Sequence, residues 1–210
     1  MNEDLLFRLL LIVVYGLFAS IRIYYRTRST APKQSEAKER EGINKIGGVA
    51  GITMSIGVIG MLISVILYLI ALPWLNWSQL PIPSLIRWIG IGLGISSLPL
   101  IIWIHRTLGK YYSAVLELKE EHILIKWGPY SRIRHPMYTT FIIFALSIAL
   151  ISANLFVIAF CILIVISFPS IAKQEEQMLI DLFGDEYRNY IKQTGRFFPR
   201  IRQQKEDTKT

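Results

Sequence analysis

Two short stretches of the chain gather side chains that can carry charge or move protons. The first is Arg134-His135-Pro136, and the second is Lys173-Gln174-Glu175-Glu176, directly after an apolar run. Pro136 suits the first turn of a helix and forces His135 towards an extended conformation. The imidazole is therefore expected at a defined point, where a loop enters an apolar helix.

The direction of Glu175 follows from helical spacing. In a helix, Glu175 shares one face with residues at i+3, i+4 and i+7, which are Met178, Leu179 and Leu182. Glu176 then lies about 100° away, towards the edge of that face. An unpaired buried charge is expensive, so Glu175 needs a partner. Two alternatives stay open: it pairs with a nearby Arg or Lys, or it binds an ammonium or hydroxyl group of a ligand.

Other kinds of site are not indicated by the sequence. His105, His122 and His135 are too dispersed for a metal motif, and no Cys or Asp joins them. We therefore expect no metal. The chain has no serine nucleophile elbow and no phosphate loop. The glycines inside apolar runs are typical of close helix packing.

Five apolar runs must position these groups. Residues are 52% hydrophobic and the mean hydropathy is +0.42, and a helix needs about 20 apolar residues to cross a bilayer. The runs cover residues 5–24, 46–72, 85–104, 137–151 and 155–172. The last two are short and separated by residues 152–154 only, which predicts a tight helical hairpin. Pro169 is expected to loosen the end of the fifth helix.

The sequence thus predicts an all-α integral membrane protein with about five transmembrane helices and a cytoplasmic C-terminal helical segment. Residues 1–104 would form the first three helices. Residues 105–210 would form a catalytic loop, the hairpin and the C-terminal segment, in one integrated membrane domain.

The basic residues predict the orientation. Residues 22–45, 105–136 and 173–210 hold 21 of the 23 basic residues, whereas residues 73–83 and 152–154 hold none. The positive-inside rule places the N-terminus outside and the C-terminus in the cytoplasm, in a plasma or inner membrane. Topology also explains the net charge of +8, so we expect membrane lipids and no nucleic acid as partners.

Three motifs in order carry a family resemblance. GPYSRIRHPMY (128–138), EEQMLIDLFGDEYRNY (175–190) and RFFP (196–199) resemble the isoprenylcysteine carboxyl methyltransferase family, whose relatives include phospholipid methyltransferases. The resemblance covers roughly residues 108–199. It implies a membrane methyltransferase that uses S-adenosylmethionine without a soluble Rossmann fold, and a lipophilic or prenyl/lipid-like acceptor that enters from the bilayer. Carboxyl O-methylation is one such reaction.

The resemblance also implies roles for individual residues. Those expected to bind the cofactor are His122, Ile123, Leu124, Ile125, Tyr130, His135, Pro136, Met137, Tyr138 and Glu175. The candidate catalytic residues are Arg134 and Glu176, with Arg134 orienting an anionic acceptor.

The chain departs from the family at residue 171. The family's prenylcysteine enzymes have an arginine four residues before the glutamate, where this chain has Ile171. The acceptor is therefore left open among lipid-like carboxylates, amines, thiols and hydroxyls. Two alternative functions also stay open: an NADPH enzyme like the sterol reductases, and a non-catalytic membrane scaffold.

Overall fold

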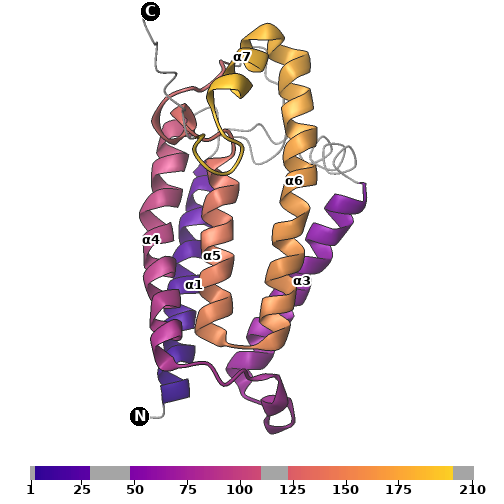
Figure 1. Cartoon of the computed structure of the whole chain (residues 1–210). Coiled ribbons are helices and arrows are strands. Elements are labelled where there is room, and N and C mark those ends of the chain that lie inside the picture. Colours follow the sequence, from indigo (N-terminus) through magenta and orange to yellow (C-terminus); the bar gives the residue numbers. More distant parts are fainter. Residues whose placement is uncertain (1–2, 29–47, 110–122, 201–210) are drawn as a thin grey trace, which may run out of the picture.

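A computed structural model describes residues 3–28, 48–109 and 123–200, and these form a helical bundle (Figure 1). The described residues contain no strand. The long helices are α1 (Glu3–Arg28), α3 (Val49–Ile70), α4 (Ser84–Leu108), α5 (Pro136–Ser152) and α6 (Leu155–Phe183). Shorter pieces are η1 (Pro73–Ser78), η3 (Gly128–Ser131) and α7 (Asp185–Gln193).

The membrane class is confirmed. Four of the described helices, α1, α3, α4 and α6, are long and apolar enough to span a bilayer, and α5 is a shorter apolar helix of 17 residues. Helix α4 packs against α1 and α5, whereas α3 packs along α6. The first turn of α1 and helix α7 lie at opposite ends of the bundle in Figure 1.

The predicted hairpin between α5 and α6 is confirmed. Ala153 ends α5 with a left-handed backbone, φ 47°. Asn154 caps α6, because its Oδ1 accepts from the amides of Phe156 and Val157 at 3.0 and 3.3 Å. The Asn154 amide also donates to Ser78 Oγ at 2.8 Å, so the hairpin turn is fixed to η1.

Glycines allow helices to approach closely, as expected. A Cβ atom at Gly60 of α3 would lie 2.2 Å from the ring of Phe160 in α6. A Cβ atom at Gly94 of α4 would lie 2.6 Å from Ser147 Oγ in α5. Larger residues would push these helix pairs apart.

The predicted end of the fifth apolar helix, which is α6 in the structure, is wrong. Helix α6 continues through Pro169 to Phe183, and Ser167 Oγ donates to the carbonyl of Ile164 at 2.6 Å next to the proline. The prediction ended the helix where hydropathy falls, at Lys173, although a helix can continue with polar residues. A helix of 29 residues is about 43 Å long at ~1.5 Å per residue. It exceeds the ~30 Å hydrocarbon core, so its polar end projects beyond the apolar layer.

A buried arginine ties four helices together near the N-terminus. Arg87 Nη1 donates to Asp4 Oδ1 at 2.7 Å, Nη2 to Tyr68 Oη at 2.9 Å, and Nε to the carbonyl of Ile151 at 3.0 Å. Its guanidinium also lies 4.0 Å above the ring of Phe7. We call Asp4, Tyr68 and Arg87 the Arg87 cluster.

Candidate active site

The motif residues meet at the end of the bundle that carries α7 (Figure 1). An isolated parallel bridge pairs Ile133 with Gly195. The amides of Arg134 and His135 donate to the carbonyls of Gly195 and Arg196 at 2.8 and 3.0 Å. The loop before α5 and the segment after α7 are therefore held side by side, although about 60 residues separate them in sequence.

Gly195 makes this close approach possible. A Cβ atom at this position would lie 1.7 Å from the carbonyl oxygen of Phe198. The turn is fixed further by Thr139, whose Oγ1 donates to the carbonyl of Phe197 at 2.6 Å. No residue larger than glycine fits at position 195 unless the turn changes.

Two carboxylates of α6 face one imidazole. His135 Nδ1 lies 3.2 Å from Glu175 Oε2, and His135 Nε2 lies 3.3 Å from Glu176 Oε1. Tyr138 Oη donates to Glu175 Oε1 at 2.6 Å. We call these residues, together with Arg134 and Arg196, the His135 cluster.

Glu176 is enclosed by arginines. Arg134 Nε donates to Glu176 Oε1 at 2.8 Å, and both side chains are less than a tenth exposed. Arg196 donates from Nη2 and Nε to the two oxygens of Glu176 at 2.5 and 3.1 Å. Arg134 Nη1 also donates to the carbonyls of Ile191 and Thr194. This arrangement anchors the segment after α7.

The predicted positions of the two glutamates are therefore only partly right. Glu175 does face the other site residues, but the expectation that Glu176 lies towards the edge is wrong. Its side chain is 7% exposed, against 22% for Glu175. The helical wheel considered the apolar residues of α6 alone, whereas Glu176 is covered by residues 194–196 and by Arg134.

The two carboxylates control the protonation of His135. Burial alone lowers the pKa of an imidazole, but the hydrogen bonds and negative charges of Glu175 and Glu176 outweigh it. The pKa of His135 is therefore raised above its ordinary value. A protonated ring can donate to both carboxylates at once, so the imidazolium fits this position.

The region around Glu175 fits a cationic ligand. Glu175 is the less enclosed of the two carboxylates, and Tyr138 and His135 orient it. Phe168 stacks on Tyr138, with ring centroids 4.9 Å apart. A partly exposed carboxylate beside aromatic rings suits a ligand that carries an ammonium or sulfonium group.

The structure brings together only some of the residues predicted to form the site. Arg134, His135, Tyr138, Glu175 and Glu176 belong to one connected network of contacts. The carbonyl of Tyr130 accepts from Tyr190 Oη at 2.6 Å, so Tyr130 contributes its backbone to the support of α7.

Other predicted residues lie further from the carboxylates. Met137 points towards α1, where its sulfur accepts from Arg22 Nη1 at 3.4 Å. Pro136 lines a separate cavity of about 440 Å³ between α4, η3 and α5. Ile123 is exposed, Leu124 is half-buried and Ile125 is buried. His122 lies outside the described residues.

Arg196 was not predicted as a site residue. In the sequence Arg196 is the first residue of the RFFP motif, which supported the family resemblance only. The fold was needed to place this residue against Glu176.

Comparisons with known proteins find relatives of this chain. Residues 90–181, which include most of α4, all of α5 and most of α6, match the model of the isoprenylcysteine carboxyl methyltransferase (ICMT) family. This part of the chain is similar to the ICMT family. The resemblance expected from the motifs is confirmed.

Curated relatives match over a similar length. Protein-S-isoprenylcysteine O-methyltransferase of Saccharomyces cerevisiae is 34% identical over 98 residues, which are 45% of this chain and 41% of the relative. The enzyme of the same name from Schizosaccharomyces pombe is 30% identical over 96 residues, 44% of this chain and 41% of the relative. The cobalt-zinc-cadmium resistance protein CzcN of Cupriavidus metallidurans is 29% identical over 97 residues, 45% and 44%. The chain thus matches less than half the length of these relatives.

A solved structure shows the same fold. The structure of the eukaryotic intramembrane Ras methyltransferase ICMT aligns with a TM-score of 0.55 and 20% sequence identity. The alignment covers 91% of this chain and 68% of that chain. The helical membrane fold therefore extends beyond the region that the family model matches.

Proposed function

We propose that this protein is an integral membrane methyltransferase that uses S-adenosylmethionine and acts on a lipophilic small molecule or a prenyl- or lipid-like acceptor. The observation that carries the proposal is the contact between Tyr138, Glu175 and His135 at the end of an apolar bundle. These residues lie within the part of the chain that matches the ICMT family. The names of the two yeast relatives favour an oxygen atom as the methyl acceptor, and the description of the matching family favours a carboxyl group.

The cofactor side of the proposed site centres on Glu175. When bound, S-adenosylmethionine supplies a methyl group carried on a positively charged sulfur. Glu175 attracts the cationic cofactor, while Tyr138 and His135 keep the carboxylate in one orientation. The remaining predicted contacts are Tyr130, Pro136, Met137 and residues 122–125. Holding donor and acceptor in line contributes up to ~7–11 kcal/mol in favourable cases.

The acceptor side is assigned to the arginines. Two guanidinium groups and the His135 imidazolium outnumber the two carboxylates within the His135 cluster. The resulting positive charge favours an anionic acceptor such as a carboxylate. We assign Arg134 and Glu176 to this part of the site, where their ion pair fixes the segment that covers the acceptor.

The proposed orientation places this end of the bundle in the cytoplasm of a cell with a plasma or inner membrane. The described parts of the basic segments, residues 105–109, 123–136 and 173–200, belong to this end. Residues 73–83 and 152–154, which hold no Lys or Arg, belong to the other end. The cofactor then enters from the cytoplasm, and the acceptor enters laterally between helices.

Isothermal calorimetry on the detergent-purified protein tests the proposal. We expect micromolar binding of S-adenosylmethionine and no binding of NADPH, with weaker binding in Glu175→Gln. Asp181→Asn is the matched control, because Asp181 is an exposed acid of the same helix that contacts Gln177. Binding of NADPH alone would indicate a reductase, and binding of neither compound would refute an S-adenosylmethionine enzyme.

A further inference from the structure

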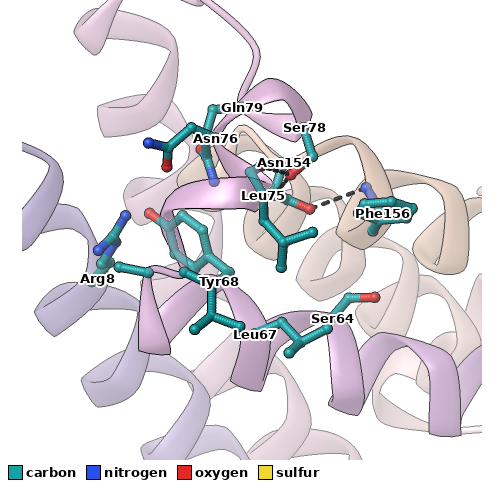
Figure 2. Close-up of a pocket in the computed structure, with 12 residues that line it drawn as sticks. Arg8, Ser64, Leu67, Tyr68, Leu75, Asn76, Ser78, Gln79, Asn154 and Phe156 are labelled. Atoms are coloured by element: carbon teal, nitrogen blue, oxygen red, sulfur yellow. Dashed lines mark hydrogen bonds between the residues drawn. The ribbon is translucent and has the colours of Figure 1, made fainter.

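The bundle contains cavities at both ends. The cavity at the N-terminal end lies among Arg8, Tyr68 and Asn154 (Figure 2), and its volume of about 20 Å³ leaves room for about one water molecule. The cavity at the other end lies between α4, η3 and α5, and its volume is about 440 Å³. This volume falls within the range of about 300–1,000 Å³ that is usual for small-molecule sites. We call it the Trp103 cavity, after the tryptophan of α4 in its wall.

The Trp103 cavity lies on the far side of α5 from the proposed active site. Its wall includes Leu100, Trp103 and Ile104 of α4, and Pro136 and Thr140 of α5. Tyr138, which donates to Glu175, points about 200° away from Pro136 around the helix. A ligand in this cavity would therefore be separated from Glu175 by α5, and its binding does not depend on the proposed function.

The wall of the Trp103 cavity is largely apolar, because its hydroxyl groups are used within the protein. Ser131 and Thr140 each donate to a backbone carbonyl of their own segment, at 2.8 and 3.0 Å. Thr139 donates to the carbonyl of Phe197 at 2.6 Å. The other described side chains of the wall, apart from that of Arg132, are aliphatic or aromatic. Such a wall favours a hydrocarbon chain over a polar ligand.

Arg132 supplies the one charge in the described part of the wall. Its side chain is exposed, and its guanidinium forms no hydrogen bond or ion pair with a described residue. A guanidinium that solvent can reach is also within reach of a phosphate group, to which arginine donates strong, charge-assisted hydrogen bonds. An apolar interior with a cation at its edge matches a molecule that has a hydrocarbon chain and an anionic head.

The apolar surface continues from the Trp103 cavity towards the bilayer. Trp103 is 51% exposed, and Trp127, just before η3, is 50% exposed, as is typical of indoles at a membrane interface. The face of α5 that carries Thr139 continues at i+4 and i+7 with Ile143 and Leu146. Ile143 is half-buried and Leu146 is 49% exposed. A chain that enters the cavity from the membrane therefore stays in contact with apolar side chains.

We propose that the Trp103 cavity binds an anionic phospholipid of the surrounding leaflet. One acyl chain lies between α4 and α5, and the phosphate group lies at the edge of the cavity, where Arg132 donates hydrogen bonds to its oxygens. Basic pockets between transmembrane helices bind anionic headgroups in this way. A zwitterionic lipid offers the same chains without a net negative charge, so it binds more weakly.

Quenching of Trp103 fluorescence by lipids with brominated acyl chains tests the site. The whole chain in detergent is titrated with brominated phosphatidylglycerol or brominated phosphatidylcholine. The signal of Trp103 is the difference between the wild type and Trp103→Phe. We expect phosphatidylglycerol to give half-maximal quenching at an about fivefold lower mole fraction, the factor that corresponds to about 1 kcal/mol for one arginine near a membrane surface.

Two variants at the edge of the cavity should remove this preference for phosphatidylglycerol. Arg132→Gln removes the cation, and Ser131→Glu places a negative charge beside it at an exposed position. Arg188→Gln is the matched control, because it removes one positive charge from an exposed arginine of α7 that pairs with Asp185. This variant should keep the preference of the wild type.

Each other outcome overturns the proposal. Equal quenching by the two lipids would show apolar binding only, and no quenching of Trp103 would exclude an acyl chain from the cavity. A preference that survives in Arg132→Gln or in Ser131→Glu would exclude the contact between Arg132 and the phosphate. An equal loss of preference in Arg188→Gln would assign it to the net charge of the protein.

Discussion

The two ends of the bundle contain arginines and carboxylates in different arrangements. The Arg87 cluster and the His135 cluster each bury an arginine against a carboxylate. In the Arg87 cluster, one arginine donates from Nε, Nη1 and Nη2 to three acceptors in three other helices. In the His135 cluster, two neighbouring carboxylates of α6 share one imidazole.

The difference separates a structural tie from a site. Arg87 Nε, Nη1 and Nη2 each donate to a protein acceptor, and these hydrogen bonds join four helices. Around His135, both oxygens of Glu176 accept hydrogen bonds from arginines, but Glu175 remains partly exposed beside Tyr138. One carboxylate thus holds the structure together and the next one along the helix is available to a ligand.

The largest expected effect comes from Glu176→Ala. This change leaves Arg134 buried without its carboxylate, and removing one partner of a buried pair destabilises by about 3–5 kcal/mol. Chemical unfolding in detergent should show this loss. Glu186→Ala is the control, because the Lys126–Glu186 pair is exposed and such pairs contribute only about 0–1 kcal/mol. Equal stability of the two variants would contradict the structural role of Glu176.

Arg87→Met tests the same comparison at the Arg87 cluster, at the other end of the bundle. It removes hydrogen bonds to Asp4, Tyr68 and the carbonyl of Ile151, and bonds to a charged group contribute about 1.5–3 kcal/mol each. We expect the free energy of unfolding to fall by only about 3 kcal/mol in total. Contributions within one hydrogen-bond network do not add, and the largely exposed Asp4 carboxylate regains water when the arginine is lost. Calorimetry should show unchanged affinity for S-adenosylmethionine. A large loss of affinity would mean that the two clusters are coupled.

Glu175→Gln should weaken ligand binding more than it lowers stability, which is the opposite of the result expected for Arg87→Met. Losing the partly exposed negative charge should weaken S-adenosylmethionine binding about tenfold, or ~1.4 kcal/mol. The unfolding free energy should change less than in Glu176→Ala, because Tyr138 can still donate to the amide oxygen. Titration calorimetry and unfolding on the same preparation separate the two effects. A variant that loses stability but keeps its affinity would reverse the assignment of the two glutamates.

The smallest expected effect is a dependence of stability on pH. The pKa of His135 is raised in the folded protein, so its contribution to stability is fully present below the unfolded value of about 6.5. It is lost as the pH rises through the folded pKa. Wild-type stability should therefore decline above pH 6.5, and His135→Gln should flatten this decline. A decline of equal size in the variant would assign it to another group.

Much of the fold followed from the sequence because membrane spans depend on local composition. The apolar runs located the helices, and residues 152–154 located the hairpin turn. Pro136 marked the start of α5 correctly, since its missing amide and fixed φ suit a first turn. The motif order also indicated which loops meet, although their hydrogen bonds through Gly195 required the structure.

The remaining features depend on contacts that no local pattern contains. The burial of Glu176 arises from residues about 20 positions later, which a helical wheel cannot include. The partnership of Arg87 with Asp4 requires α1 and α4 to be neighbours, and neither residue lies in a motif. Continuation of α6 past Pro169 was hidden because the change in polarity at Lys173 marks the end of the apolar layer and not the end of the helix.

The bridge between Ile133 and Gly195 has a consequence for biosynthesis. The ribosome synthesises α1 to α6 before it makes residues 194–197. Until then, the amides of Arg134 and His135 lack their acceptors, and Glu176 lacks Arg196. A nascent chain whose apolar helices have already been synthesised therefore still has an unassembled site. The site closes only when residues 194–197 are translated and fold back onto the loop before α5.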